Sequence, residues 1–122
     1  MEKIPNQNLH KLAQYTADFI KSKTGKGPRD IKSYWLENKV FIEMIDLLTP
    51  IELEIASTVD GTMNVKLARE RFYDKYAEKY HSIAGEILGC HIKRGCVIWD
   101  ISHDEAYIVL TVSDKAGVEQ MA

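Results

Sequence analysis

The stretch from residue 25 to residue 50 reads GKGPRDIKSYWLENKVFIEMIDLLTP and contains a helix stop, two strand patterns and a helix start. Gly25 can take the left-handed conformation that ends a helix, and Pro28 cannot continue one. Two runs rich in β-branched and aromatic residues follow, Asp30–Leu36 and Lys39–Leu47. The stretch therefore predicts a helix end and then a β-hairpin.

The clearest helix start in the chain closes this stretch. Thr49 suits the N-cap, Pro50 suits the first helical position, and Glu52 completes a capping box. We expect this short helix to end near Ser57, because Val59–Thr62, with the sequence VDGT, has the composition of a turn.

Helical periodicity flanks the hairpin on both sides. Apolar residues recur at i, i+3, i+4 and i+7 in Asn6–Ser22, and a long helix is predicted over Met63–Leu88 with Gly89 as its C-cap. Mixed charges on the long helix, Arg69 among them, are typical of a solvated face. Its expected apolar stripe comprises Val65, Ala68, Phe72, Tyr76, Ile83 and Ile87, flanked by Tyr73 and Tyr80.

A second hairpin follows, with strands at Cys90–Ile101 and Ala106–Ser113, a break near Gly95 and a turn at Ser102–Glu105. The element order α-β-β-α-α-β-β predicts an α+β two-layer sandwich, with helices packed on one face of a mostly antiparallel four-stranded sheet. We expect a single domain over residues 1–122, with an ordered core at 6–114 and a disordered tail at 115–122.

Composition and charge narrow the class of protein. The chain has 122 residues, 45% hydrophobic and 28% charged, with a formal net charge of −2. This balance indicates a soluble globular domain and no nucleic-acid partner. The chain has neither an apolar run of roughly 20 residues nor a signal-peptide core, so we expect no direct membrane insertion. Any association with a membrane should therefore go through a partner. The two cysteines, too few for a disulfide scaffold, fit the reducing cytoplasm.

The second hairpin is apolar on both of its faces, whereas the helices can cover only one face of the sheet. An uncovered apolar face usually binds a partner, and a second copy of the chain is the simplest one. We therefore expect a homodimer or a higher homo-oligomer. The residues assigned to this interface, or to the structure beneath it, are Trp99, Ile101, Tyr107 and Val109.

The most distinctive polar segment is the turn that ends the first helix. Gly25, Lys26, Gly27 and Arg29 combine glycine amides with positive charge, a combination that can bind an anion. A helix stop before a strand explains Gly25 and Pro28 equally well, so a structural role stays open.

Metal and thiol chemistry are weakly supported. Cys90 and Cys96 do not have the close spacing of a zinc knuckle, and they are expected to pack as small apolar side chains. Asp100, Ser102 and Asp104 offer oxygen ligands to a hard cation, but serine and aspartate more often cap turns. We expect turn capping here, and neither a metal nor a catalytic residue.

Several of these segments recur together in one known family. Gly25–Pro28 stands before a hairpin, Leu48–Pro50 before an acidic short helix, Leu88–Cys90 after the long helix, and Asp100–Ser102 before the last strand. In this order they resemble the MpsC-like family of small bacterial proteins. The likeness covers Leu9–Ser113.

The family takes its name from a Na⁺-translocating, membrane-potential-generating system linked to uptake of dissolved inorganic carbon. The resemblance implies a soluble accessory component of that system, without established catalytic residues. We therefore expect a non-enzymatic accessory or regulatory protein that needs no cofactor and has a membrane transporter subunit as a candidate partner. The alternative is a sensor of a small anion or a nucleotide that uses the Gly25–Pro28 turn.

Overall fold

The computed structural model describes residues 3–114 and has the α+β architecture that the sequence predicts. The tail expected at 115–122 lies outside the described residues. The elements follow one another along the chain as α1 (Asn6–Thr24), β1 (Asp30–Leu36), β2 (Lys39–Ile45), α2 (Pro50–Ile55), α3 (Val59–Leu88), β3 (His91–Asp100), a 3₁₀ turn (Ile101–His103) and β4 (Glu105–Ser113).

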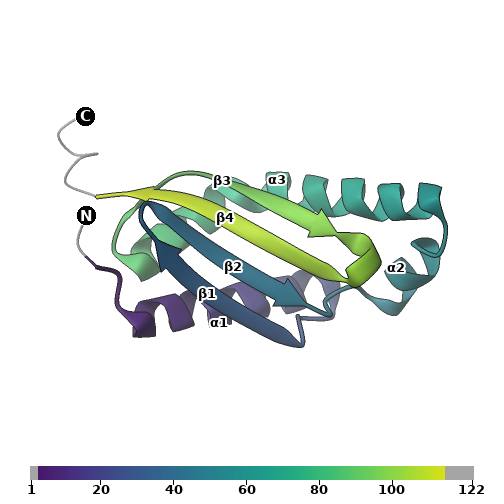
Figure 1. Cartoon of the computed structure of the whole chain (residues 1–122), viewed down its shortest axis with the longest axis horizontal. Coiled ribbons are helices and arrows are strands. Elements are labelled where there is room, and N and C mark those ends of the chain that lie inside the picture. The colour runs from purple at the N-terminus through teal and green to yellow at the C-terminus, as the bar shows by residue number, and fades with distance from the viewer. Residues whose placement is uncertain (1–2, 115–122) are drawn as a thin grey trace.

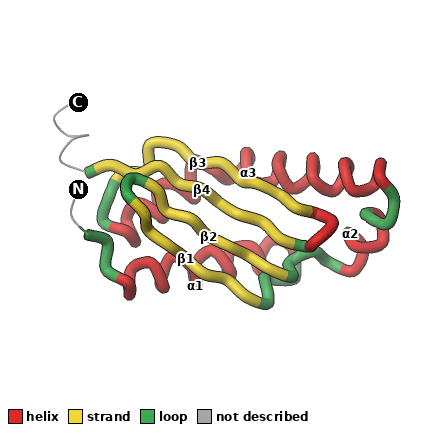
Figure 2. Tube along the Cα trace, in the orientation of Figure 1, coloured by secondary structure: helices red, strands yellow, loops and turns green. Residues whose placement is uncertain are grey.

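The four strands form one antiparallel sheet in the order β1-β2-β4-β3. Helices α1 and α3 lie behind this sheet on one face, α1 along β1 and α3 along β3 (Figure 1). Among residues 3–114, no helix covers the other face, and α2 with the first turns of α3 lies beyond one end of the sheet (Figure 2). The expected two-layer arrangement is confirmed.

The main core lies between the sheet and the two long helices. Alternate residues of β2 and β4 face each other across the ladder and are almost fully buried, as strand geometry requires when one face is covered. Ser33 donates a hydrogen bond to the Leu9 carbonyl (2.8 Å), and Thr16 bonds Tyr80 (2.7 Å). These bonds tie α1 to β1 and to α3.

Helix α3 begins earlier than the sequence predicted. The segment VDGT is the first turn of the helix, because Thr58 caps it by accepting a hydrogen bond from the Gly61 amide (2.9 Å). Gly61 packs against the Ile55 carbonyl at the end of α2, where a Cβ atom would overlap that oxygen. The glycine that suggested a turn is needed for close packing between α2 and α3.

The buried side of α3 also differs from the expected stripe. Ala68 is exposed, whereas Tyr80, Ala84 and Leu88 are at most 4% exposed. Arg69, which we assigned to a solvated face, is also buried. Only the first turns of α3 extend past the strands (Figure 1), and the helix covers the sheet from about Arg69 onward.

Strand β3 is irregular at Lys93 and not at Gly95. The ladder shifts register between Ile92 and Arg94, so Lys93 is a bulge, while Gly95 pairs regularly with Leu110. Tyr73 and His81, two turns apart on α3, bond each other over this strand (2.6 Å). A Cβ atom at Gly95 would lie only 2.5 Å from the Tyr73 hydroxyl, so the glycine makes room for the helix.

Candidate functional site

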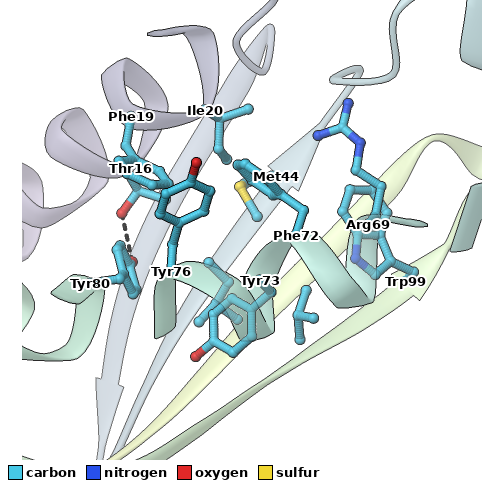
Figure 3. A pocket seen from close by; sticks show the side chains of 12 residues that line it. Thr16, Phe19, Ile20, Met44, Arg69, Phe72, Tyr73, Tyr76, Tyr80 and Trp99 are labelled. Carbon is cyan, nitrogen blue, oxygen red and sulfur yellow. Dashed lines mark hydrogen bonds between the residues drawn. The ribbon is translucent and has the colours of Figure 1, made fainter. Parts of the chain in front are cut away.

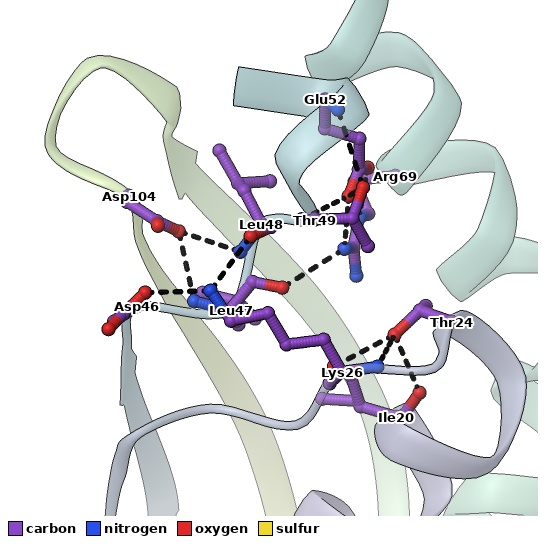
Figure 4. A network of polar contacts seen from close by, with 10 residues as sticks. All are labelled: Ile20, Thr24, Lys26, Asp46, Leu47, Leu48, Thr49, Glu52, Arg69 and Asp104. Carbon is purple, nitrogen blue, oxygen red and sulfur yellow. Dashed lines mark hydrogen bonds and ion pairs between the residues drawn. The ribbon is translucent and has the colours of Figure 1, made fainter. Parts of the chain in front are cut away.

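The predicted anion-binding turn lies at the end of α1, next to the end of β2. Lys26 Nζ donates to Asp46 Oδ1 (2.8 Å) and to the Leu48 carbonyl (3.0 Å). Arg29 Nε donates to Asp46 Oδ2 (3.2 Å). Both cations of the turn are therefore paired with the Asp46 carboxylate. Figure 4 shows the pair that Lys26 forms with it.

These contacts also account for the rest of the turn. The hydrogen bond from Lys26 is the main cause that lowers the pKa of Asp46 below its ordinary value. Gly25 ends α1 in the left-handed conformation, and Gly27 lies against α1 close to Ala17. The four predicted residues lie together, and their geometry fastens α1 to the loop after β2.

The acidic cluster at the end of β3 fixes backbone segments in place. Asp104 Oδ1 accepts hydrogen bonds from the Leu47 and Leu48 amides (3.0 and 2.9 Å), which fixes the loop between β2 and α2 (Figure 4). Asp100 accepts bonds from Ser102 and from the His103 amide (3.0 and 3.3 Å). The capping role that we preferred is confirmed for Asp100, which caps the 3₁₀ turn, whereas Asp104 binds a distant loop and Ser102 bonds the Asp100 carboxylate. Within residues 3–114, no three His, Cys, Asp or Glu side chains are close enough together to bind a metal ion.

A buried ion pair joins α2 to α3 in the same region. Arg69 donates to both carboxylate oxygens of Glu52 (2.6 and 2.7 Å) and to the Leu47 carbonyl (3.3 Å). Its guanidinium also stacks 5.4 Å from the ring centre of Trp99. Burial raises the pKa of Glu52, but the bonds from Arg69 and Thr49 outweigh this and lower it overall. Sequence periodicity missed this pair, because a charged residue on a mixed helix looks solvated.

An aromatic crevice lies between α1 and α3 over the sheet (Figure 3). It encloses about 460 Å³ including its open mouth. The hydroxyls of Thr16 and Tyr80 bond each other within it, and Lys23 Nζ lies 5.0 Å from the ring centre of Tyr76. Its walls are the packed edges of the core, formed mainly by Phe19, Ile20, Met44, Phe72, Tyr73, Tyr76, Val97, Trp99 and Ile108.

The four residues assigned to an interface divide between the two sides of the sheet. Trp99 contacts Arg69, and Ile101 is buried in a small second core with Leu48 and Val65, so these two belong to the covered side. Tyr107 and Val109 point away from the helices. We call their side, formed by the outward residues of all four strands, the open sheet face.

A second apolar surface lies on α2 and the start of α3. Its six side chains are 46–80% exposed, which is unusual for residues of this size. On α3 they recur every four residues and therefore share one side of the helix. We call this set of side chains the overhang patch; it comprises Ile51, Leu53, Ile55, Val59, Met63 and Leu67. On α2, Ile51 and Ile55 share one side of the helix and Leu53 lies on the opposite side.

Over the same described residues, no helix combines the length and the apolar character required to cross a bilayer. Comparison with known proteins identifies the family of this chain. Residues 6–114 match the family model described as Na⁺-translocating membrane potential-generating system (MpsC). Neither a curated protein nor a solved structure gives a significant match. Because the matched segment covers nearly the whole length, the chain belongs to the MpsC family.

Proposed function

We propose that this protein is a non-enzymatic, cytoplasmic accessory or regulatory component of the Na⁺-translocating membrane potential-generating system, and that the overhang patch binds a subunit of that system. The observation that carries the proposal is the exposure of six apolar side chains on two adjoining helices at one end of the molecule. Apolar clusters of this kind mark protein interfaces on soluble domains.

Charges of both signs lie around the overhang patch. Glu54 and Asp60 are exposed beside it, and so are Lys66 and Arg71. These four charges balance, so the apolar area is the part of the patch that we propose the membrane subunit contacts.

The polar residues of the candidate sites favour an accessory role over catalysis. Asp46 is engaged by Lys26 and Arg29, and Asp104 is engaged by two backbone amides. Glu52 is held by a buried arginine. Each group stabilises the junction between elements, and a catalytic group would instead have to remain available to a substrate. The same ion pairs argue for a structural role of the glycine turn over anion sensing.

The test is purification from the host organism with gently solubilised membranes, followed by native mass spectrometry. The wild-type protein should carry a subunit of the Na⁺-translocating system, identified by peptide sequencing. The double variant Met63→Lys and Leu67→Lys should lose it, because lysine replaces apolar contact area with charge. Lysine is a good helix former, so α3 should stay folded.

The matched control is the double variant Gln7→Lys and Ser82→Lys, which adds the same two charges at exposed positions of α1 and of the second half of α3. It should retain the subunit. The proposal fails if the wild-type protein carries no subunit of that system, or if the Met63→Lys and Leu67→Lys variant retains the subunit as well as the control does.

A further inference from the structure

The open sheet face has an ordered charge pattern along its strands. The register places outward residues in four rows that run across the sheet. The row at one end contains two cations, Lys39 on β2 and Arg94 on β3. The row at the opposite end contains three carboxylates, those of Asp30, Glu105 and Asp100. Arg29 lies 3.4 Å from the Asp30 carboxylate and His103 lies 2.9 Å from that of Asp100, so these two partners offset part of the negative charge.

The two rows between these ends are mainly apolar. The first comprises Tyr34, Phe41, Val109 and Cys96, one residue from each strand. The second contains Tyr107 and Ile98, together with the opposite charges of Lys32 and Glu43. Tyr34 and Ile98 are 45% and 54% exposed. The face is thus basic at one end, apolar in the middle and acidic at the other end.

Such a face is complementary to itself in one orientation only. A two-fold axis parallel to the strands would set the basic end of one copy on the basic end of the other. A two-fold axis across the strands reverses the strand direction and sets the basic end on the acidic end, while the apolar rows meet in the middle.

We propose that two copies of this chain pack through their open sheet faces, with the strands of the two sheets antiparallel. In this arrangement each strand lies over the same strand of the second copy. Arg94 faces Asp100 of the second copy, and Lys39 lies among the second copy's Glu105 and Asp30. Symmetry makes every one of these contacts occur twice. The proposal goes beyond binding of a membrane subunit and does not depend on it.

The area of the open sheet face determines how tightly we expect two copies to bind. Four strands of seven residues cover about 19 Å by 23 Å, a footprint of about 440 Å² per copy. This is below the roughly 800 Å² per partner of a standard stable interface. We therefore expect a reversible dimer that forms in the micromolar to submillimolar concentration range.

Charge reversal tests both the surface and its orientation. Lys39→Glu sets a carboxylate against the second copy's acidic row, and Glu105→Lys sets an ammonium group against the basic row. Each variant alone should lose self-association in sedimentation equilibrium, with a dissociation constant raised at least tenfold. Mixing the two variants should restore a dimer, because the carboxylate introduced at position 39 of one chain then meets the ammonium group introduced at position 105 of the other. The unchanged Lys39 and Glu105 of the two chains still pair in the same mixture.

Matched controls carry the same reversals on the opposite layer, at two exposed positions of α1, Lys11→Glu and Asp18→Lys. Both should dimerise like the wild type. Circular dichroism of each variant, compared with the restored mixture, separates loss of the interface from loss of the fold. A wild-type protein that stays monomeric up to about 500 μM, single variants that still dimerise, or a mixture that stays monomeric would each overturn the proposal.

Discussion

At the scale of single residues, the contact of greatest consequence is the one between Arg69 and Glu52. A guanidinium that is 4% exposed loses nearly all its hydration, so its two bonds to the carboxylate and its stacking on Trp99 must compensate. The pair joins α2 to α3 at the base of the overhang patch. We infer that it holds α2 against α3 and so keeps the exposed apolar residues of the two helices together.

Removing either partner should therefore destabilise the fold. Arg69→Ala should lower the free energy of unfolding by about 3 kcal/mol or more, because the Glu52 carboxylate is left half-buried without its cation. Arg69→Lys should recover part of this loss, since it keeps the charge but not the two-pronged geometry. Urea denaturation of the two variants and the wild type measures both differences. An Arg69→Ala protein as stable as the wild type would contradict the inference.

The same pair predicts how stability depends on pH. The pKa of Glu52 is lower in the folded chain than its ordinary value of 4.5. Its contribution to stability is therefore complete above pH 4.5 and is lost as the pH falls through the lower folded pKa. Glu52→Gln should flatten the acid limb of a plot of unfolding free energy against pH. Glu54→Gln, a change at an exposed site of the same helix, should leave that limb unchanged.

At the scale of elements, the sequence correctly predicted the caps and turns that depend on local signals. The capping box of Thr49 and Glu52, the hairpin turn after Leu36 and the left-handed cap at Gly89 all act within four residues. The start of α3, the bulge at Lys93 and the burial of Arg69 were wrong or missed. Each of these depends on a neighbour from another element, which periodicity along one segment cannot reveal.

Gly61 gives a direct test of that distinction. Replacing glycine by alanine inside a helix ordinarily stabilises it by about 1 kcal/mol. Here we expect the opposite sign, because the added methyl group would overlap the Ile55 carbonyl and push α2 away. Thermal unfolding of Gly61→Ala should show a lower Tm than the wild type. Asn64→Ala, at an exposed position one turn further along α3, should show an unchanged or slightly higher Tm.

At the scale of the whole molecule, the fold separates two surfaces. The open sheet face lies on the side away from the long helices, while the overhang patch lies beyond the end where β2 leaves the sheet (Figure 1). That end is also the acidic end of the face, because Asp30 and Glu105 belong to its row. An antiparallel dimer therefore carries its two overhang patches at opposite ends.

This geometry predicts the stoichiometry of the assembly. A dimer with patches at both ends should bind two membrane subunits, and avidity should hold it at the membrane more firmly than one copy. Native mass spectrometry should show two copies with two subunits for the wild type and one copy with one subunit for Lys39→Glu. The Met63→Lys and Leu67→Lys double variant should give a dimer without subunits. If Lys39→Glu also abolished subunit binding, the two surfaces would not be independent, and the subunit site would have to extend across the dimer.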